Sequence, residues 1–153
     1  MSKNKEIGLA VVGCGTIGRI RAIMARDYPG IGWIGLCDIN KELGNKLQKD
    51  CDADFFTENY TELLKRPEVN AVIVATDENH HFGPIMASLE KNSSLFIEKP
   101  LATDLTESRE VLDKIRSSNV DAVLGYTQRF RRRFLAVKQK LLDDKIGNVT
   151  SVV

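Results

Sequence analysis

Short runs of consecutive apolar residues recur along the chain and alternate with longer segments in which apolar positions return every three or four residues. Continuous runs favour strands covered on both faces, and the longer segments favour amphipathic helices. The pattern predicts strands over residues 7–12, 31–37, 54–56, 71–75, 95–97 and 122–126. It predicts helices over residues 17–26, 41–49, 60–66, 82–91, 105–117 and 129–142. This alternation predicts an α/β fold with a doubly wound, mainly parallel sheet.

Polar residues and helix breakers mark the ends of these segments. Asn40, Asn59 and Asp104 stand where a side chain can cap the first turn of the helix that follows. Pro29 and Pro67 follow the first and third predicted helices and end them.

The C-terminal stretch differs from the rest of the chain. Its predicted helix carries an apolar face formed by Phe130, Phe134, Val137 and Leu141, and a turn follows. The apolar residues 149–153 then predict the opening of another strand. Either this strand pairs with an edge of the same domain, or its partner sheet is not part of the chain.

A glycine pattern joins the first predicted strand to the first predicted helix. Gly13, Gly15 and Gly18 have the spacing G-x-G-x-x-G, and Asp38 ends the second predicted strand. In a dinucleotide-binding turn the first glycine permits a sharp bend and the second lets a pyrophosphate approach the backbone. The third lets the helix pack closely on the strand. The glycines alone also fit a turn in another α/β domain, but the strand, the helix and Asp38 together predict a nucleotide site.

The start of the first helix and the end of the second strand suggest which dinucleotide binds. The N–H groups near Thr16 and Ile17, with the positive end of the helix dipole, face the phosphates in this arrangement. The Asp38 carboxylate can accept hydrogen bonds from ribose hydroxyls and would repel a 2′-phosphate. We therefore expect NAD rather than NADP as the cofactor.

Composition and charge narrow the class of protein. The 153 residues suit about one domain, and 42% hydrophobic with 28% charged residues is ordinary for a globular protein. A net charge of +1 gives no electrostatic case for a nucleic acid or a membrane as partner. The N-terminal residues lack a signal-peptide pattern and no apolar run has the length of a membrane helix, so we expect a cytoplasmic protein.

Cysteine and histidine spacing predicts no metal site. Cys14, Cys37 and Cys51 are odd in number and lack paired spacing, which argues against both a disulfide framework and a zinc site. The adjacent His80 and His81 have no carboxylate at ligand spacing. Cys14 lies in the glycine turn, where a helix N-terminus could lower its pKa, although no partner for a catalytic thiol is identifiable.

Polar residues also follow the fourth, fifth and sixth predicted strands, at the sheet edge where ligands bind. They are residues 76–81 (Thr-Asp-Glu-Asn-His-His), 98–100 (Glu-Lys-Pro) and 127–129 (Thr-Gln-Arg). With the glycine turn, these motifs in this order resemble the Gfo/Idh/MocA oxidoreductases, which include glucose–fructose oxidoreductase and inositol dehydrogenase. The resemblance covers nearly the whole chain, and the Glu-Lys-Pro triplet is its most specific motif. It implies a Rossmann fold and an NAD-dependent dehydrogenase of a sugar, polyol or cyclic alcohol.

The resemblance assigns roles to the residues that follow the strands. Lys99 would lie near the nicotinamide and hold or help to deprotonate the substrate hydroxyl, and a neighbouring cationic ring would lower its pKa. The alternative for Lys99 is a solvated side chain at a loop mouth. Glu98 would position the cofactor or Lys99, and Thr76 would contact the cofactor. The Lys99–Pro100 bond is expected to be cis, as in relatives.

The loop after the fourth strand departs from the family pattern. Asp77 and Glu78 stand where the family has Pro and Asn. His81 matches the family histidine, and two roles stay open for it, at the cofactor or as a residue that holds the loop by hydrogen bonds.

Members of this family carry a second substrate domain, which this chain would lack. We therefore expect residues 1–128 to form the NAD-binding domain, and residues 129–153 to be a connecting helix and first strand leading to that α/β domain. The chain alone would bind NAD with little turnover, and the full-length protein would be a homo-oligomer. Arg129, the first of four arginines near this junction, is the best candidate to face substrate.

Other functions remain open. The arginines at positions 129, 131, 132 and 133 could suggest nucleic acid, but a solvated helix face explains them better and we expect no such partner. A non-catalytic NAD-binding regulatory module is one alternative function. A methyltransferase that uses S-adenosylmethionine is another, although the three-glycine spacing and Glu-Lys-Pro favour a dinucleotide.

Overall fold

A computed structural model describes residues 6–151 of the chain. Residues 1–5, which make up most of the N-terminal segment used to predict the cellular location, lie outside the described range. Val152 and Val153, the end of the last predicted strand, also lie outside it.

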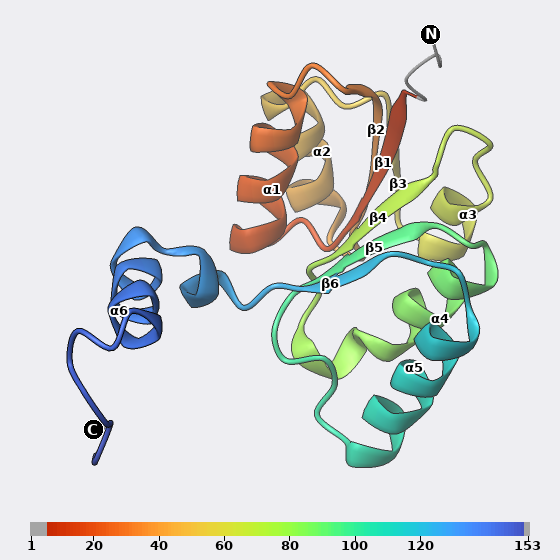
Figure 1. Ribbon diagram of the computed structural model, residues 1–153. Coiled ribbons are helices and arrows are strands. Elements are labelled where there is room, and N and C mark those ends of the chain that lie inside the picture. Colours follow the sequence, from red (N-terminus) through yellow and green to blue (C-terminus); the bar gives the residue numbers. More distant parts are fainter. Residues whose placement is uncertain (1–5, 152–153) are drawn as a thin grey trace, which may run out of the picture.

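Six parallel strands form one sheet in the order β3-β2-β1-β4-β5-β6 (Figure 1). Their bounds are β1 Ile7–Val12, β2 Ile31–Cys37, β3 Phe55–Thr57, β4 Ala71–Val74, β5 Ser94–Ile97 and β6 Ala122–Leu124. The strand order reverses between β1 and β4, which are neighbours in the sheet. The predicted doubly wound parallel sheet is confirmed, and its switch point lies where β1 and β4 end side by side.

Helices cover both faces of the sheet (Figure 1). They are α1 Thr16–Arg26, α2 Lys41–Asp50, α3 Tyr60–Leu64, α4 Phe82–Glu90, α5 Leu105–Ser117 and α6 Arg132–Leu142. Two 3₁₀ turns, η1 Glu78–His80 and η2 Thr127–Phe130, follow β4 and β6. α1 and α2 lie on one face, and α3, α4 and α5 lie on the other. Within residues 6–151, no helix combines the length and the apolar character needed to span a bilayer.

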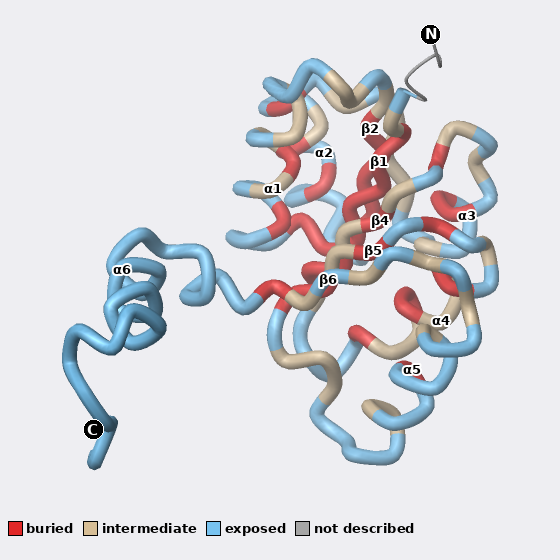
Figure 2. Tube along the Cα trace, in the orientation of Figure 1, coloured by how far each residue is buried: buried red, intermediate tan, exposed pale blue. Residues whose placement is uncertain are grey.

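Alternate residues of the strands supply two hydrophobic cores, one on each face. The central strand β1 contributes to both, with Ala10 and Val12 on one side and Leu9 and Val11 on the other. Figure 2 shows the buried positions concentrated on the inner strands and on the helix faces turned towards them. This burial on both sides explains why the strands read as continuous apolar runs in the sequence.

The predicted helix caps are confirmed. The side chain of Asn40 accepts hydrogen bonds from backbone N–H groups at the start of α2, and Asn59 and Asp104 do the same at α3 and α5. Each cap satisfies donors that the first helical turn would otherwise leave without a partner. These local signals are the reason that the observed element bounds follow the sequence pattern closely.

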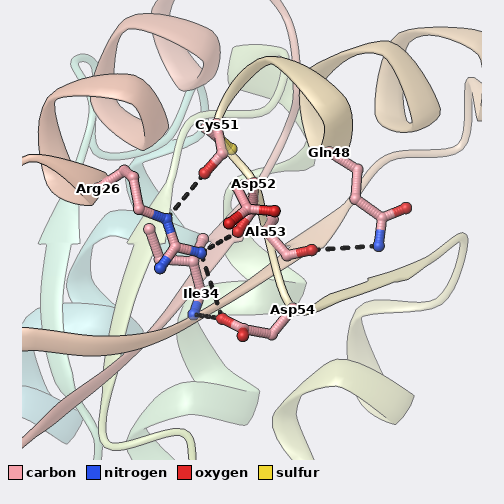
Figure 3. A network of polar contacts seen from close by, with 7 residues as sticks. All are labelled: Arg26, Ile34, Gln48, Cys51, Asp52, Ala53 and Asp54. Carbon is pink, nitrogen blue, oxygen red and sulfur yellow. Dashed lines mark hydrogen bonds and ion pairs between the residues drawn. The ribbon is translucent and has the colours of Figure 1, made fainter.

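One ion-pair network fastens the end of α1 to the connection between α2 and β3 (Figure 3). The Arg26 guanidinium donates to the carbonyl oxygens of Cys51, at 2.8 Å, and Asp52, and to the Asp54 carboxylate at 3.3 Å. Asp54 Oδ2 also accepts a hydrogen bond from the backbone N–H of Ile34 in β2, at 2.8 Å. The network therefore links a helix, a loop and a strand at the end of the sheet away from the glycine turn.

The C-terminal segment departs from the sequence prediction in two ways. The helix predicted from residue 129 begins at Arg132, because η2 comes first and Arg131 has an extended backbone. Residues 149–151 form no strand, so the first alternative, pairing with an edge of this domain, is wrong over the part that the structure describes. A strand is defined by its ladder partner, and the described strands pair only with one another.

α6 stands beside the domain with no buried residue (Figures 1 and 2). Its apolar face, predicted from the sequence, is solvent-facing in this chain, with 46% of Phe134 and 52% of Val137 exposed. The helix therefore forms as its sequence pattern predicts, but nothing within residues 6–151 buries its apolar face.

Candidate functional site

A cleft of about 490 Å³ lies at the carboxyl ends of the inner strands, next to the switch point. It joins the glycine turn and Asp38 to the segment that follows β5. The lining residues are Gly13, Gly15, Thr16, Ile17, Arg21, Asp38, Ala75, Thr76, Asp77, Glu98, Lys99, Gly125 and Thr127. Motifs that are far apart in the sequence thus share one cavity, at the place where doubly wound sheets bind ligands.

The three motif glycines have different neighbours. Gly13 has a positive φ of 100°, and a side chain there would collide with the Ala75 backbone. A Cβ on Gly18 would collide with the carbonyl of Gly13, so this glycine lets α1 pack against the turn. No atom lies within 4 Å of the position that a Cβ on Gly15 would take. Gly13 and Gly18 are therefore required by packing, whereas Gly15 leaves open space.

The N-terminus of α1 offers its N–H groups to the cleft. Gly15 is the N-cap residue and provides no side-chain cap, in contrast to Asn40, Asn59 and Asp104 at other helices. Thr16 and Ile17 follow it, and both are exposed. A helix N-terminus without a side-chain cap, next to the free space at Gly15, can accommodate the pyrophosphate of a dinucleotide.

Asp38 follows β2 beside the glycine turn, and two backbone N–H groups hold its carboxylate. Its Oδ2 accepts from Cys14 at 2.6 Å, and its Oδ1 accepts from Asn40 at 2.7 Å. Each carboxylate oxygen can accept a second hydrogen bond. Both oxygens of Asp38 therefore keep acceptor capacity for further donors in the cleft.

Two residues after β4 add polar groups to the cleft. The hydroxyl oxygen of Thr76 is buried and has no hydrogen-bond partner among the described residues. Asp77 accepts hydrogen bonds from the backbone N–H of Asn79 at 3.1 Å and from its side-chain amide at 2.9 Å, and these bonds lower the pKa of Asp77. Thr76 lines the cleft, and a buried hydroxyl without a partner is uncommon in folded proteins.

The segment after β5 places opposite charges next to each other. Glu98 is buried and forms an ion pair with Arg21 of α1, with Arg21 Nη2 at 2.6 Å from Glu98 Oε1. Lys99 is exposed and lines the cleft. The Lys99–Pro100 peptide bond is cis, as the resemblance implied.

His81 lies behind the cleft, with 1% of its surface exposed. Its Nδ1 is 2.8 Å from the Pro100 carbonyl oxygen, and its Nε2 is 3.3 Å from the Thr76 carbonyl oxygen. The ring therefore connects the loop after β4 to the loop after β5. This geometry favours the loop-holding role over direct contact with the cofactor, while the neighbouring His80 is exposed.

The cysteines do not provide a reactive thiolate. Burial, followed by the negative charge of Asp38, raises the pKa of Cys14 to about 12 and that of Cys37 to about 12. The lowered pKa considered for Cys14 from its position near a helix N-terminus is wrong, because burial and Asp38 act in the opposite direction. Burial also raises the pKa of Cys51. Among residues 6–151, no three His, Cys, Asp or Glu side chains gather in a way that could hold a metal ion.

Sequence reasoning missed some residues of the cleft, chiefly Arg21 and Gly125. Thr127, one of the polar residues expected after the sixth strand, does line the cleft. Arg21 comes four residues after Ile17 on α1 and therefore shares its helix face. Gly125 leaves room for Glu98, since a Cβ there would lie 2.9 Å from Glu98 Oε2.

Comparison with known proteins agrees with this geometry. Residues 7–126 match the family described as "Oxidoreductase family, NAD-binding Rossmann fold", Gfo/Idh/MocA. The chain is 26% identical over 143 residues to scyllo-inositol 2-dehydrogenase (NAD(+)) of Bacillus subtilis (strain 168), covering 93% of this chain and 42% of that protein. It is 28% identical over 145 residues to 2,7-anhydro-N-acetylneuraminate hydratase of Mediterraneibacter gnavus, covering 95% of this chain and 38% of that protein.

A solved structure of myo-inositol dehydrogenase from Lactobacillus casei, in complex with NAD(H) and myo-inositol, has the same fold as this chain. Its TM-score is 0.85 and its sequence identity is 26%, with 92% of this chain and 42% of that chain covered. The present chain thus spans about two fifths of the length of the relatives it matches. These comparisons give no support to a methyltransferase. The chain belongs to the Gfo/Idh/MocA oxidoreductase family, and its fold is that family's NAD-binding Rossmann domain.

Proposed function

We propose that this chain is the cofactor-binding domain of an NAD-dependent dehydrogenase that acts on a sugar, polyol or other cyclic alcohol. The observation that carries the proposal is the single cleft that joins Asp38 and the glycine turn to Lys99. Bound NAD would supply the hydride acceptor at the Lys99 end. The names of two relatives, which are dehydrogenases of scyllo-inositol and myo-inositol, support a cyclic polyol as substrate.

The lining residues divide the cleft into an adenosine end and a reactive end. Asp38 would bind the ribose hydroxyls, and the N–H groups of Thr16 and Ile17 would bind the pyrophosphate. Thr76 and Glu98 would face the nicotinamide half, together with the neighbouring Lys99.

Lys99 is the proposed catalytic residue. Its exposed side chain would bind the substrate hydroxyl and, as the neutral amine, accept the hydroxyl proton while the carbonyl forms. This residue directly follows the buried Glu98. Its backbone position is therefore fixed although its side chain reaches solvent.

We also propose that residues 1–128 form the NAD-binding unit and that residues 129–153 lead to a second, substrate-binding domain. The exposed apolar face of α6 and the greater length of the relatives support this division. In that arrangement Arg129 would face the substrate side, and the full-length protein would be a cytoplasmic homo-oligomer with no nucleic-acid partner.

The test uses the protein in the longest form that its gene encodes. With NAD and scyllo-inositol, myo-inositol or glucose, we expect steady formation of NADH. Lys99→Met should lower turnover by about a hundredfold or more, the range of acid–base catalysis, with little change in NAD affinity measured by calorimetry. The 153-residue chain should bind NAD without sustained turnover.

Two results would redirect the proposal. NAD binding without oxidation of any alcohol would favour the non-catalytic regulatory module. Undiminished turnover in Lys99→Met would remove this lysine from the reaction and leave the fold assignment intact.

A further inference from the structure

Arg21 and Glu98 form an ion pair across the cleft, between α1 and the end of β5. Arg21 donates through Nε at 2.8 Å and through Nη2 at 2.6 Å, and both bonds go to Glu98 Oε1. Only 24% of the Arg21 side chain and 11% of the Glu98 side chain are exposed. Both side chains are less exposed than their counterparts in the other ion pairs of α1, which strengthens the interaction between the charges.

The surroundings hold both partners in place. The Arg21 guanidinium lies over the Phe96 ring, 4.8 Å from its centroid. The backbone N–H of Glu98 donates to the carbonyl of Val74 at 2.9 Å, which extends the pairing of β4 and β5 by one residue. Gly125 has no side chain to occupy the space next to Glu98 Oε2. The Glu98 carboxylate is thus built into the wall of the cleft next to Lys99.

The lining at this end of the cleft carries two acidic and two basic side chains. Asp77 and Glu98 are acidic, and Arg21 and Lys99 are basic. Loss of Arg21 would leave the Glu98 carboxylate without a counter-charge beside the space where the nicotinamide ring would lie. Loss of the Glu98 charge would leave a guanidinium there instead.

We propose that Arg21 is a positioning residue which neutralises Glu98 and holds it against α1, so that the nicotinamide end of the cleft presents a wall without net charge and Lys99 remains free for the substrate. This inference rests on the proposed function, because it requires the nicotinamide to reach Glu98. It adds a residue outside the glycine and Glu-Lys-Pro motifs, and it predicts how the site discriminates between the two redox forms of the cofactor.

NAD⁺ and NADH provide the measurement, since they differ in the charge of the nicotinamide ring and share the same phosphates. In Arg21→Met the unpaired Glu98 should attract the cationic ring, so that the ratio of the NADH Kd to the NAD⁺ Kd rises by on the order of tenfold. In Glu98→Gln the unpaired Arg21 should repel that ring, and the same ratio should fall. The double variant Arg21→Met/Glu98→Gln should return the ratio to near its original value.

Two further variants show whether a change in the Kd ratio comes from the charge at position 21 or from a general effect of substitution in α1. Arg21→Lys keeps the positive charge and should keep the ratio. Arg19→Met removes one positive charge from the same helix, at a residue that is paired with Asp50 at 3.2 Å and does not line the cleft, and it should also leave the ratio unchanged. Thermal unfolding of each variant monitors its stability.

The outcomes are distinct from those that test the function. Equal weakening of both cofactor forms in Arg21→Met and Glu98→Gln, with a constant ratio, would overturn the positioning role and leave NAD binding in place. Failure of the unmodified chain to bind either form would instead overturn the proposed function. Opposite shifts in the two single variants, cancelled in the double variant, would support the inference.

Discussion

The Asp38 carboxylate accepts a hydrogen bond from the backbone N–H of Cys14 at 2.6 Å, which ties the end of β2 to the glycine turn. The residue proposed to bind the ribose thus also fixes the turn proposed to bind the phosphates. A substitution at Asp38 therefore affects both halves of the adenosine site.

Replacement of Asp38 tests this double role. Asp38→Ala should weaken NAD binding by about ten- to a hundredfold, because hydrogen bonds to a charged group contribute about 1.5–3 kcal/mol. It should also narrow the preference for NAD over NADP, since the charge that repels a 2′-phosphate is gone. Titration calorimetry with both cofactors measures the two effects, and an unchanged NAD affinity would remove Asp38 from the site.

The same added methyl group should reduce stability at Gly13 and cofactor affinity at Gly15. Gly13→Ala should destabilise the fold by about 1–3 kcal/mol, because φ is positive and the Ala75 backbone occupies the space. Gly15→Ala should change stability by about 0.5 kcal/mol or less, since its Cβ meets nothing. It should nevertheless weaken NAD binding about tenfold or more by keeping the pyrophosphate from the backbone. Urea unfolding and calorimetry on both variants provide the comparison, and equal loss of stability would contradict it.

Arg26 should contribute to stability without affecting the cofactor. Arg26→Ala removes the hydrogen bonds to the carbonyls of Cys51 and Asp52 and should cost about 1–2 kcal/mol in the free energy of unfolding. NAD affinity should stay the same, because the network lies away from the cleft. Arg19→Ala is the matched control on the same helix, and its exposed pair with Asp50 should contribute about 0.5 kcal/mol or less.

The buried thiols predict a loss of stability at high pH. The pKa values of Cys14 and Cys37 lie at about 12 in the folded chain and near their ordinary value of 9.0 when unfolded. Above that ordinary value the unfolded state releases these protons first, so the free energy of unfolding should fall as the pH rises from 9 towards 12. The double variant Cys14→Ala/Cys37→Ala should show a shallower fall in urea titrations at several pH values. Parallel curves for the two proteins would rule out this contribution.

Most of the fold is predictable from local patterns in the sequence. Asn40, Asn59 and Asp104 act at fixed distances from their helices, so their roles follow from neighbouring residues alone. The glycine turn and the residues after β4 and β5 were also identifiable, since a parallel sheet collects strand ends at one edge.

The features that sequence reasoning missed depend on long-range contacts or on burial. The ion pair of Arg21 with Glu98 joins residues that are 77 positions apart, and no local spacing predicts it. For Cys14, the position near a helix N-terminus predicted a lowered pKa. Burial raises that pKa instead, and burial depends on how the whole core packs. The strand predicted over residues 149–153 required a ladder partner, which no local pattern can supply.

The position of β1 between β2 and β4 has a consequence for synthesis of the protein. Val12 pairs with Cys37 on one side and with Val74 on the other, so the central strand has only one neighbour until residues 71–74 have left the ribosome. Gly13 packs against the backbone of Ala75, which emerges at the same stage. We therefore expect the nascent chain to acquire a cofactor-binding turn late, and NAD to have no effect on the earlier steps of its folding.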